Sequence, residues 1–371
     1  MPRRRFLAVA ATASTTLALG ATAQGAAAGG APTLLSVKRI WSAKDAMRAR
    51  FTGLVHFKDR WYLAFRESGV VLPDPGPTSA NHGAVRVISS PDGEQWESVA
   101  FFAKAGHDLR DPKITATPDG RLMAYCLTPN LAWFSGDGRR WSGAHEFAPR
   151  DERFWRVDWH QGVAYTVNNM SREGATTRPL RLYRSDPAKT GWDVEDGIPF
   201  EVVCANMLPR GYPDGTTPDT AKLRMVEPSL VFRPDGTCVA LVRRQDDVRG
   251  VGTIGVVGTA KPPYTDWNWK ILNHEIGAPH MIQLPDGRLV AGVRLYRPLP
   301  KDAPGGRRTA LVWVDPEKGS VEEFLTLPSG NHTSYAGLVY REGILWVSYY
   351  SAHESKVYDF TSIYLAKVRV N

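Results

Sequence analysis

The sequence predicts an all-β fold, a six-bladed β-propeller whose N-terminal strand closes the last blade. Three observations predict it. A strand–turn–strand unit occurs six times, two further turns share the pattern S-x-D-G-x-x-W, and one early strand has no hairpin partner before it. A multi-stranded unit that recurs at intervals of this size is typical of propellers.

The clearest hairpin is the fourth, V-E-P-S-L-V-F-R-P-D-G-T-C-V-A-L-V-R-R at residues 226–244. Its apolar residues alternate with a period of two, as they do in strands. The Pro-Asp-Gly at residues 234–236 supplies the turn, because Pro presets φ, Asp hydrogen-bonds locally and Gly accepts a positive φ. Glu227 begins this hairpin and Arg243 ends it.

The other five hairpins follow the same plan in chain order. They span residues 50–67, 110–126, 156–167, 277–294 and 334–350, and the third copy has the weakest pattern. Each is followed by further strand-like residues, so each hairpin is expected to form the inner half of one blade.

The third strands of the first two blades end in the shared turn, S-P-D-G-E-Q-W at residues 90–96 and S-G-D-G-R-R-W at residues 135–141. We expect the carboxylates of Asp92 and Asp137 to hold these turns and the tryptophans to fill the space between blades. Degraded copies lie at residues 184–192, 258–267 and 313–324.

The ring must close, and L-L-S-V-K-R-I-W at residues 34–41 is the strand available to close it. We expect it to join the last sheet as the outer strand, next to residues 363–368, because closure removes exposed edges. The predicted organisation is a signal peptide at residues 1–23, a flexible linker at residues 24–33 and one propeller domain at residues 34–371.

The first residues indicate export. The run R-R-R-F-L at residues 3–7 is a twin-arginine type of start, and a small, apolar stretch follows it. An A-x-A cleavage site at residues 21–23 precedes Gln24. An ordinary Sec signal is the alternative, and both predict a secreted protein. The apolar run is short for a membrane anchor, so no membrane insertion is expected after the signal is removed.

The charge and the cysteines exclude several classes of partner. The net charge is +8, and removing residues 1–23 with their three arginines leaves +5. No basic run is interleaved with aromatic residues, which argues against nucleic acid. The three cysteines, Cys126, Cys204 and Cys238, are expected to be structural thiols rather than a disulfide. No residues have metal-ligand spacing, so no metal or cofactor is predicted, and a monomer is expected.

Polar residues begin or end the hairpins, and in a propeller the innermost strands line the central channel. Arginines held in a concave site demand anionic partners, because an unpaired buried charge is costly. A surplus of arginine therefore suits a carboxylate ligand. The hairpin-end residues are Arg50, Arg66, Glu67, Arg110, Asp111, Arg156, Glu227, Arg243, His280, Arg294 and Tyr335.

With its two S-x-D-G-x-x-W turns, known as Asp boxes or BNR repeats, and its six hairpins, the chain resembles the sialidase (neuraminidase) superfamily over residues 34–370. The resemblance implies a six-bladed propeller hydrolase that releases an acidic sugar, sialic acid or a related one, from a glycan. The Asp box also occurs in propellers that are not enzymes, so the hairpin-end residues carry the functional part of the resemblance.

Several hairpin-end residues match positions of that family's active site. Arg50 stands where the family has the first arginine of its carboxylate clamp, although Phe51-Thr52 replaces the usual Ile-Pro. Glu227 matches the family's glutamate. The remaining matches are Arg243 (or Arg244 if the register slips) for the second arginine, Arg294 or else Arg308 for the third, and Tyr335 in T-S-Y-A-G-L for the nucleophilic tyrosine.

The family's acid/base aspartate has no clear match. It should lie on the loop after the first hairpin, where this chain offers Asp74 and, at the aligned position, His82. Asp111 is a third candidate, on the second hairpin. The remaining expected substrate-binding residues are Arg66, Arg110, Arg156 and also His82.

The resemblance implies a mechanism. A carboxylate nucleophile would be repelled by the substrate's own carboxylate, so the neutral Tyr335 hydroxyl attacks while Glu227 takes its proton. A carboxylic acid protonates the leaving oxygen. Two alternatives remain open: a glycan-binding propeller without activity, and a lyase that cleaves a uronate polymer.

Each functional assignment has a structural alternative. Glu227 and Arg243 could form only a salt bridge, and Tyr335 could pack between blades. Arg66-Glu67 and Arg110-Asp111 could be self-contained ion pairs. Arg156 could stack on the neighbouring tryptophans, and His82 and His280 could be ordinary hydrogen-bonded residues.

Overall fold

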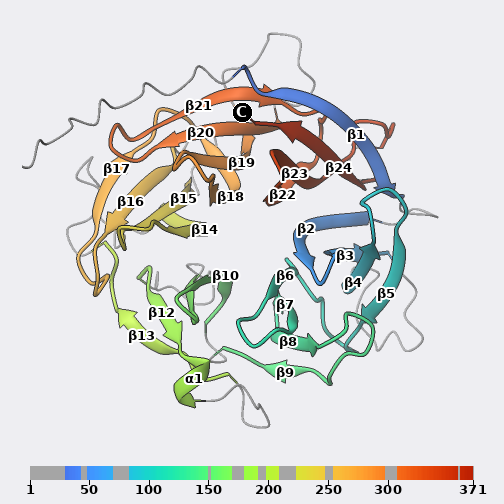
Figure 1. The fold of residues 1–371 in the computed structure, drawn as a ribbon, viewed down its shortest axis with the longest axis horizontal. Helices are drawn as coiled ribbons and strands as arrows, with labels where there is room; N and C mark the ends of the chain where they lie inside the picture. Colours follow the sequence, from blue (N-terminus) through green and yellow to red (C-terminus); the bar gives the residue numbers. More distant parts are fainter. Residues whose placement is uncertain are drawn as a thin grey trace, which may run out of the picture.

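The computed structural model describes the ranges 30–42, 48–69, 83–148, 152–168, 179–190, 198–208, 223–246, 254–296, 307–357 and 360–370. Six four-stranded antiparallel sheets stand around a central axis, so the predicted six-bladed propeller is confirmed (Figure 1). The predicted signal peptide, residues 1–23, lies outside the described ranges.

Each blade runs from an inner strand at the central axis to an outer strand at the rim. Blade 1 holds β2 (Arg48–Phe57), β3 (Arg60–Ser68), β4 (Gly83–Ser90) and β5 (Glu97–Phe102). Blade 2 holds β6 (Lys113–Ala116), β7 (Leu122–Leu127), β8 (Asn130–Ser135) and β9 (His145–Glu146). Blade 3 holds β10 (Phe154–His160), β11 (Val163–Asn168), β12 (Leu182–Ser185) and β13 (Glu201–Cys204), with the short helix α1 (Pro187–Thr190).

The second half of the ring continues in the same order. Blade 4 holds β14 (Leu223–Phe232), β15 (Cys238–Asp246), β16 (Val256–Ala260) and β17 (Asn268–Ile271). Blade 5 holds β18 (Ile276–Gln283), β19 (Leu289–Leu295), β20 (Arg308–Asp315) and β21 (Ser320–Thr326). Blade 6 holds β22 (Thr333–Arg341), β23 (Ile344–Ser351), β24 (Ser362–Arg369) and β1 (Thr33–Trp41).

The ring closes as the sequence predicts. Strand β1 pairs antiparallel with β24, with Val37 opposite Ala366 and Lys38 opposite Leu365. In Figure 1 this places the blue N-terminal strand along the outer edge of the red C-terminal sheet. The first and last parts of the fold thus protect one another's edges.

The two Asp-box turns form as expected. Asp92 and Asp137 each accept backbone N–H groups of their own turn, with Oδ1 distances of 2.8 Å to the nitrogens of Glu94 and Arg139. Trp96 packs with residues of blades 1 and 6, and Trp141 with residues of blades 1 and 2. Both tryptophans therefore seal a junction between blades.

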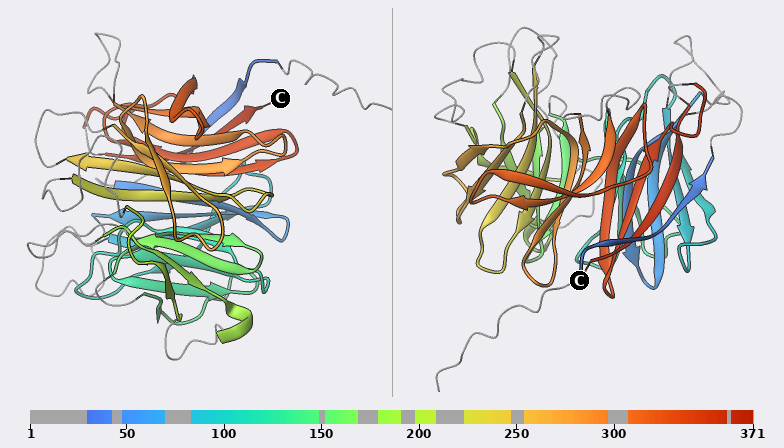
Figure 2. Two further views of the ribbon diagram at one scale, coloured as in Figure 1. Left: turned by 90° about the vertical axis from the view of Figure 1, so that its left-hand side faces the viewer. Right: turned by 90° about the horizontal axis from the view of Figure 1, so that it is seen from above.

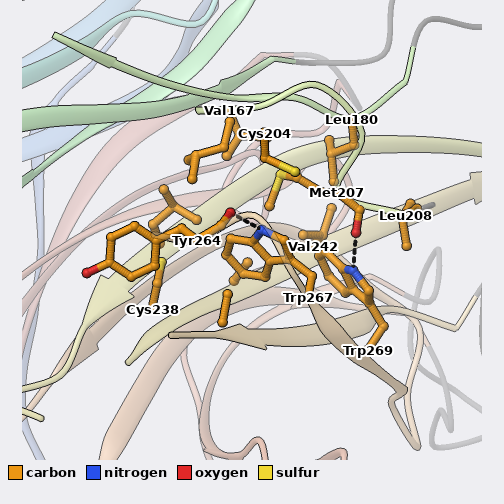
Figure 3. Close-up of a cluster of buried hydrophobic side chains, with 14 of the residues drawn as sticks. Val167, Leu180, Cys204, Met207, Leu208, Cys238, Val242, Tyr264, Trp267 and Trp269 are labelled. Carbon is orange, nitrogen blue, oxygen red and sulfur yellow. Dashed lines mark hydrogen bonds between the residues drawn. The ribbon is translucent and has the colours of Figure 1, made fainter. Parts of the chain in front are cut away.

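The core lies between neighbouring blades as a series of apolar clusters. The cluster between blades 3 and 4 includes Trp267 and Trp269, whose indole N–H groups donate to the backbone oxygens of Tyr264 at 2.9 Å and Met207 at 2.6 Å (Figure 3). Cys204 and Cys238 belong to the same cluster, and all three cysteines are free and buried, so the expectation of structural thiols is confirmed.

Seen from the side, the strands run between the two faces of the ring (Figure 2). Because each inner strand begins at the same face, residues at the starts of β2, β14 and β22 share one mouth of the channel, and the β2–β3 and β22–β23 turns lie at the other face. Within the described ranges, no helix is long and apolar enough to cross a membrane.

Candidate active site

A backbone irregularity recurs near the start of the inner strands. Pairing with the second strand shifts between Arg50 and Gly53 in blade 1, and the equivalent shift occurs in blades 3, 4, 5 and 6. At this level of the channel, six residues other than glycine have a positive φ, an uncommon conformation that marks functional sites. They are Phe51 (62°), Asp111 (50°), Glu227 (59°), Ala278 (50°), Ser334 (100°) and Tyr335 (54°).

Two of these bulge residues from opposite parts of the chain meet. The Tyr335 hydroxyl donates to Oε1 of Glu227 at 2.5 Å, although 108 residues separate them in sequence. The other Glu227 oxygen accepts the backbone N–H of Ala278 at 2.6 Å, and Nη1 of Arg243 lies 3.0 Å from Oε1. The predicted pair of tyrosine and glutamate, with Arg243 as its neighbour, is therefore assembled.

The protonation states in this pair are set by burial and by charge. Burial would raise the pKa of Glu227, which is 5% exposed, but Arg243, the Tyr335 hydroxyl, Arg294 and the Ala278 N–H together lower it. Burial raises the pKa of Tyr335 well above its usual value, and the negative charges of Glu227 and Asp111 raise it further. At neutral pH the pair is thus a neutral phenol that donates to a carboxylate.

Aromatic rings hold Tyr335 in place. Its ring lies 4.7 Å from that of Phe51 in an edge-on contact and 5.9 Å from the rings of Trp155 and Tyr350. Thr52 donates to the Tyr335 backbone oxygen at 2.8 Å. The hydroxyl is therefore positioned by contacts from blades 1, 3 and 6.

Arg294 lies behind Tyr335, with its guanidinium 5.2 Å from the Tyr335 ring centre. It donates to the oxygen of Thr333 at 2.8 Å, to the Tyr350 hydroxyl at 2.9 Å and to the Tyr296 hydroxyl at 3.3 Å. Arg294 is 5% exposed, and no carboxylate forms an ion pair with it within the described ranges. This buried cation is consequently available to an anionic ligand.

The alternative candidates for the second and third arginines, Arg244 and Arg308, are placed elsewhere. Arg308 forms an ion pair with Glu323 at 2.5 Å, on the outer half of blade 5. Arg244, the alternative to Arg243, lies opposite Met225, while Arg243 lies opposite Val226 and reaches Glu227.

Arg50 lies at the edge of this cluster. Its backbone lies opposite that of Arg66 in the antiparallel pairing of β2 with β3. Its charge lowers the pKa of the Tyr350 phenol, against the larger raising effect of burial. Three arginines from blades 1, 4 and 5 thus border the two tyrosines.

Asp111 of blade 2 interacts electrostatically with the same pair. Burial raises the pKa of its carboxyl, and Glu227 raises it further, against the charges of Lys113, Arg110 and Arg66. The charge of Asp111 in turn raises the pKa of the Tyr335 hydroxyl. Asp111 is the candidate acid that lies within the described ranges, and its charge interacts with those of both Tyr335 and Glu227. Asp74 and His82 lie outside the described ranges.

Arg66 and Arg110, both expected to bind substrate, have a carboxylate partner. Arg66 is 7% exposed and binds Asp108 at 2.5 Å, and Glu67 binds Arg86 at 2.6 Å, so the alternative of an Arg66–Glu67 pair is replaced by two other pairs. The half-exposed side chain of Arg110 lies 3.6 Å from Asp108.

Arg156 and His280 lie deeper, among charged and polar groups of the channel. Arg156 is 8% exposed, and its Nε has no hydrogen-bond partner within the described part of the chain. Its charge acts on Asp158, whose pKa burial raises to about 6. Nδ1 of His280 accepts the N–H of Leu338 at 2.9 Å, which joins blades 5 and 6. The structural alternative, in which His280 is an ordinary hydrogen-bonded residue, is therefore confirmed.

Sequence reasoning missed four residues of the site: Lys113, Trp155, Tyr296 and Tyr350. Lys113 stacks over Trp155, so it is the lysine rather than Arg156 that lies on this ring. One signal was available, since D-P-K, E-P-S and A-P-H place a proline directly after the bulge residue in blades 2, 4 and 5. Among the described residues, no group of three His, Cys, Asp or Glu side chains could hold a metal ion.

Comparisons with known proteins identify the fold. No protein-family model and no curated protein matches the chain. A Dyadobacter fermentans protein of unknown function superposes with a TM-score of 0.68 and 17% identity, covering 92% of this chain and 100% of that one. An α-L-arabinanase of Penicillium chrysogenum in complex with arabinobiose gives 0.63 and 13%, covering 90% and 98%.

A third solved structure is the GH93 α-L-arabinofuranosidase of Fusarium graminearum with arabinobiose, at a TM-score of 0.61 and 12% identity, covering 91% and 98%. At these identities the likeness shows the propeller fold, one that carries glycoside hydrolases. The chain thus shares the fold of these structures, and its function has to be argued from its own residues.

Proposed function

We propose that this protein is an exported glycoside hydrolase that releases a terminal acidic sugar, sialic acid or a related one, from a glycan. The observation that carries the proposal is the 2.5 Å hydrogen bond from the Tyr335 hydroxyl to the Glu227 carboxylate inside an arginine-bordered site. The arginine-rich N-terminus supports export, by a twin-arginine type of signal.

Tyr335 acts as the nucleophile in this proposal. A sugar that carries a carboxylate at its anomeric carbon repels a carboxylate nucleophile, whereas a neutral phenol can approach it. As the Tyr335 oxygen bonds to the anomeric carbon, its proton passes to Glu227, which already accepts the hydrogen bond. Water then releases the sugar in a second step.

Asp111 protonates the leaving oxygen. A general acid must be protonated near the working pH, and burial raises the pKa of Asp111 in that direction. The opposite shifts of Asp111 and Glu227 divide the two roles, because one carboxyl favours its acid form and the other its ionised form.

The arginines supply the preference for an acidic sugar. Arg294 is buried without a carboxylate partner in the described part of the site, and Arg243 lies beside it, shared with Glu227. A substrate carboxylate placed against Arg294 would gain charge-assisted hydrogen bonds in a site that excludes water.

A second candidate is a hydrolase of neutral furanosides, as in the named arabinan-degrading structures. It is favoured by one observation, the opposite pKa shifts of the two interacting carboxyl groups of Asp111 and Glu227, which suit a two-carboxylate glycosidase. In that mechanism Glu227 itself attacks, and Tyr335 only orients it.

The experiment compares purified wild-type protein, Tyr335→Phe and Glu227→Gln on aryl sialosides, aryl uronides and aryl α-L-arabinofuranosides. The proposal expects turnover of an acidic glycoside that both substitutions abolish. Turnover of the arabinofuranoside that survives Tyr335→Phe supports the second candidate instead. An unsaturated product that absorbs in the ultraviolet would indicate a lyase, and binding across a glycan panel without turnover would indicate a lectin.

A further inference from the structure

Lys113, the first residue of β6, is a buried lysine that the proposed mechanism does not use. Its side chain is 1% exposed, and within the described residues no carboxylate forms an ion pair with it. Lysine is almost never fully buried without a partner, because removing an ammonium group from water is costly. A buried lysine kept at the channel mouth therefore calls for an explanation.

The Lys113 ammonium folds back onto the bulge that carries Asp111. Nζ donates to the backbone oxygen of Asp111 at 3.1 Å and to that of Pro112 at 3.3 Å. It also lies 4.5 Å from the centre of the Trp155 ring, a cation–π contact with blade 3. One side chain thus joins two carbonyls of the bulge to the neighbouring blade.

The bulge in blade 2 needs such support. Asp111 has a φ of 50°, a left-handed conformation that is unfavourable for a residue with a side chain. Pro112 has no N–H to pair, and β6 begins only at Lys113, so the segment before it joins the sheet through the isolated bridge between Arg110 and Thr128.

In blades 4 and 5 the residue two positions after the bulge has an uncharged side chain that hydrogen-bonds the neighbouring blade. Ser229 in blade 4 and His280 in blade 5 follow their bulges by the same number of residues, and each accepts a backbone N–H of the next blade, Met281 and Leu338 respectively. Lys113 instead donates to its own bulge. Blade 2, which carries the candidate acid, is therefore built differently at this position.

We propose that Lys113 is a positioning residue of the candidate active site: its buried ammonium holds the Asp111 bulge so that the carboxyl faces Tyr335 and Glu227. The inference rests on the role proposed above for Asp111 as the general acid. The charged groups that act on Lys113 are Asp111 from its own blade, Arg156 from β10 and Glu227 from β14. Lys113 also interacts with the titratable imidazole of His280 from β18.

The charges fit this role. Burial and the nearby Arg156 lower the pKa of Lys113 to about 7, against the opposing effect of Asp111 and Glu227. Lys113 is in turn the first of the charges that offset the raising effect of burial on the pKa of Asp111. The lysine thus limits how far the Asp111 carboxyl is driven to its protonated form.

The test compares Lys113→Met, which keeps the length of the side chain, with Lys113→Gln, which keeps N–H donors but no charge. We expect kcat of Lys113→Met to fall about 100-fold with little change in KM, the effect of a misplaced catalytic group. Lys113→Gln should retain more activity. In both variants the fall of activity at high pH should move to higher pH, because Asp111 loses a neighbouring positive charge.

A double-mutant cycle and a measurement without substrate complete the test. Lys113→Met should slow Asp111→Asn no further, since both act through one carboxyl. Hydrogen–deuterium exchange of peptides covering residues 109–116 should rise in Lys113→Met and stay unchanged in the surface variant Lys261→Met. Hydrogen–deuterium exchange reports on the bulge even if no glycoside is turned over. Failure of the proposed function can therefore be told apart from failure of the inference about Lys113.

Four results would overturn the inference. The first three are an unaltered pH profile and kcat in folded Lys113→Met, a further loss in the double mutant beyond that of Asp111→Asn, and unchanged exchange over residues 109–116. A Lys113→Gln protein that fails to fold would also contradict it, because Lys113 would then serve folding rather than the position of Asp111.

Discussion

The outer Asp-box turns and the inner bulges of this propeller both recur, but they repeat different properties. In the turns at residues 90–96 and 135–141 the same residue types make the same hydrogen bonds. In the inner bulges the backbone conformation recurs while the side chain changes, for example from Phe51 to Glu227. A repeated sequence marks what builds the fold, and a repeated backbone with changing side chains marks the site.

Two aspartates show the physical side of this difference. The N–H groups of Arg140 and Arg139 hold the pKa of Asp137 far below its usual value, since the carboxylate is the form they stabilise. Burial drives the pKa of Asp111 in the opposite direction. The residue type is the same, but the first is fixed as an anion at the surface and the second can hold a proton in the channel.

The largest loss of kcat should come from substitutions that break the hydrogen-bonded pair of Tyr335 and Glu227. Tyr335→Phe and Glu227→Gln are each expected to lower kcat by roughly 1,000-fold or more, because one removes the nucleophile and the other the group that takes its proton. The double variant should be no slower than the worse single variant. Full additivity, measured by steady-state kinetics on the acidic substrate, would show that the two residues do not act as a unit.

A smaller loss, with a change of pH profile, is expected from Asp111→Asn. Loss of a general acid typically costs about 100- to 10,000-fold. In the wild type, activity should fall at low pH as Glu227 gains a proton, below its usual value of about 4.3, because its pKa is lowered. It should fall at high pH as Asp111 loses its proton, above its usual value of about 3.9, because that pKa is raised.

The pH profile of Asp111→Asn should keep the low-pH fall and lose the high-pH one. A high-pH fall that persists in this variant would assign it to another group, such as Lys113, whose pKa is lowered to about 7. Aryl glycosides with a good leaving group provide the control, since they need little acid assistance and should lose less activity.

The sequence predicted the repeated parts better than the site. Hairpin periodicity, the Asp boxes and the unpaired strand at residues 34–41 were sufficient for six blades and for ring closure. Glu227 was found because it begins the clearest hairpin, and Tyr335 through its T-S-Y-A-G-L context.

The rest could not be predicted because it depends on contacts between distant blades. Arg66 was expected at the ligand, but it is held by Asp108, 42 residues away. Lys113 appears in the sequence as an ordinary strand residue, and only the positive φ of Asp111 turns the two neighbouring carbonyls toward its ammonium. Arg294 was predicted as a hairpin end, but its contact with Tyr350, 56 residues away, depends on the packing of blade 5 against blade 6.

An effect limited to binding is expected from Arg294→Met. The guanidinium would supply charge-assisted hydrogen bonds worth about 1.5–3 kcal/mol to a substrate carboxylate, so KM for an acidic glycoside should rise about 10- to 100-fold. The matched control is Arg308→Met, one strand away in the same sheet but paired with Glu323. Equal effects of the two variants on KM would remove Arg294 from the ligand site.

The smallest expected effect is a change in thermal stability, without a change in activity, from glycine substitutions in the turns. Gly138 has a φ of 72°, and a Cβ at this position would meet the Tyr62 hydroxyl of blade 1. Gly120, in the blade 2 hairpin turn, has a similar φ of 78° but nothing within 4 Å of a Cβ. Both alanine variants carry the left-handed strain of about 1–2 kcal/mol, and only Gly138→Ala also disturbs the junction between blades.

Gly138→Ala should therefore melt at a lower temperature than Gly120→Ala, while both keep the wild-type kcat because the turns lie away from the channel. In a domain of this size each 1 kcal/mol shifts the melting temperature by about 2–4 °C or less, so the strain shared by the two variants cancels in the difference between them. Equal melting temperatures would mean that Tyr62 moves aside freely, and that the Asp-box turn is held by its own hydrogen bonds rather than by its contact with the neighbouring blade.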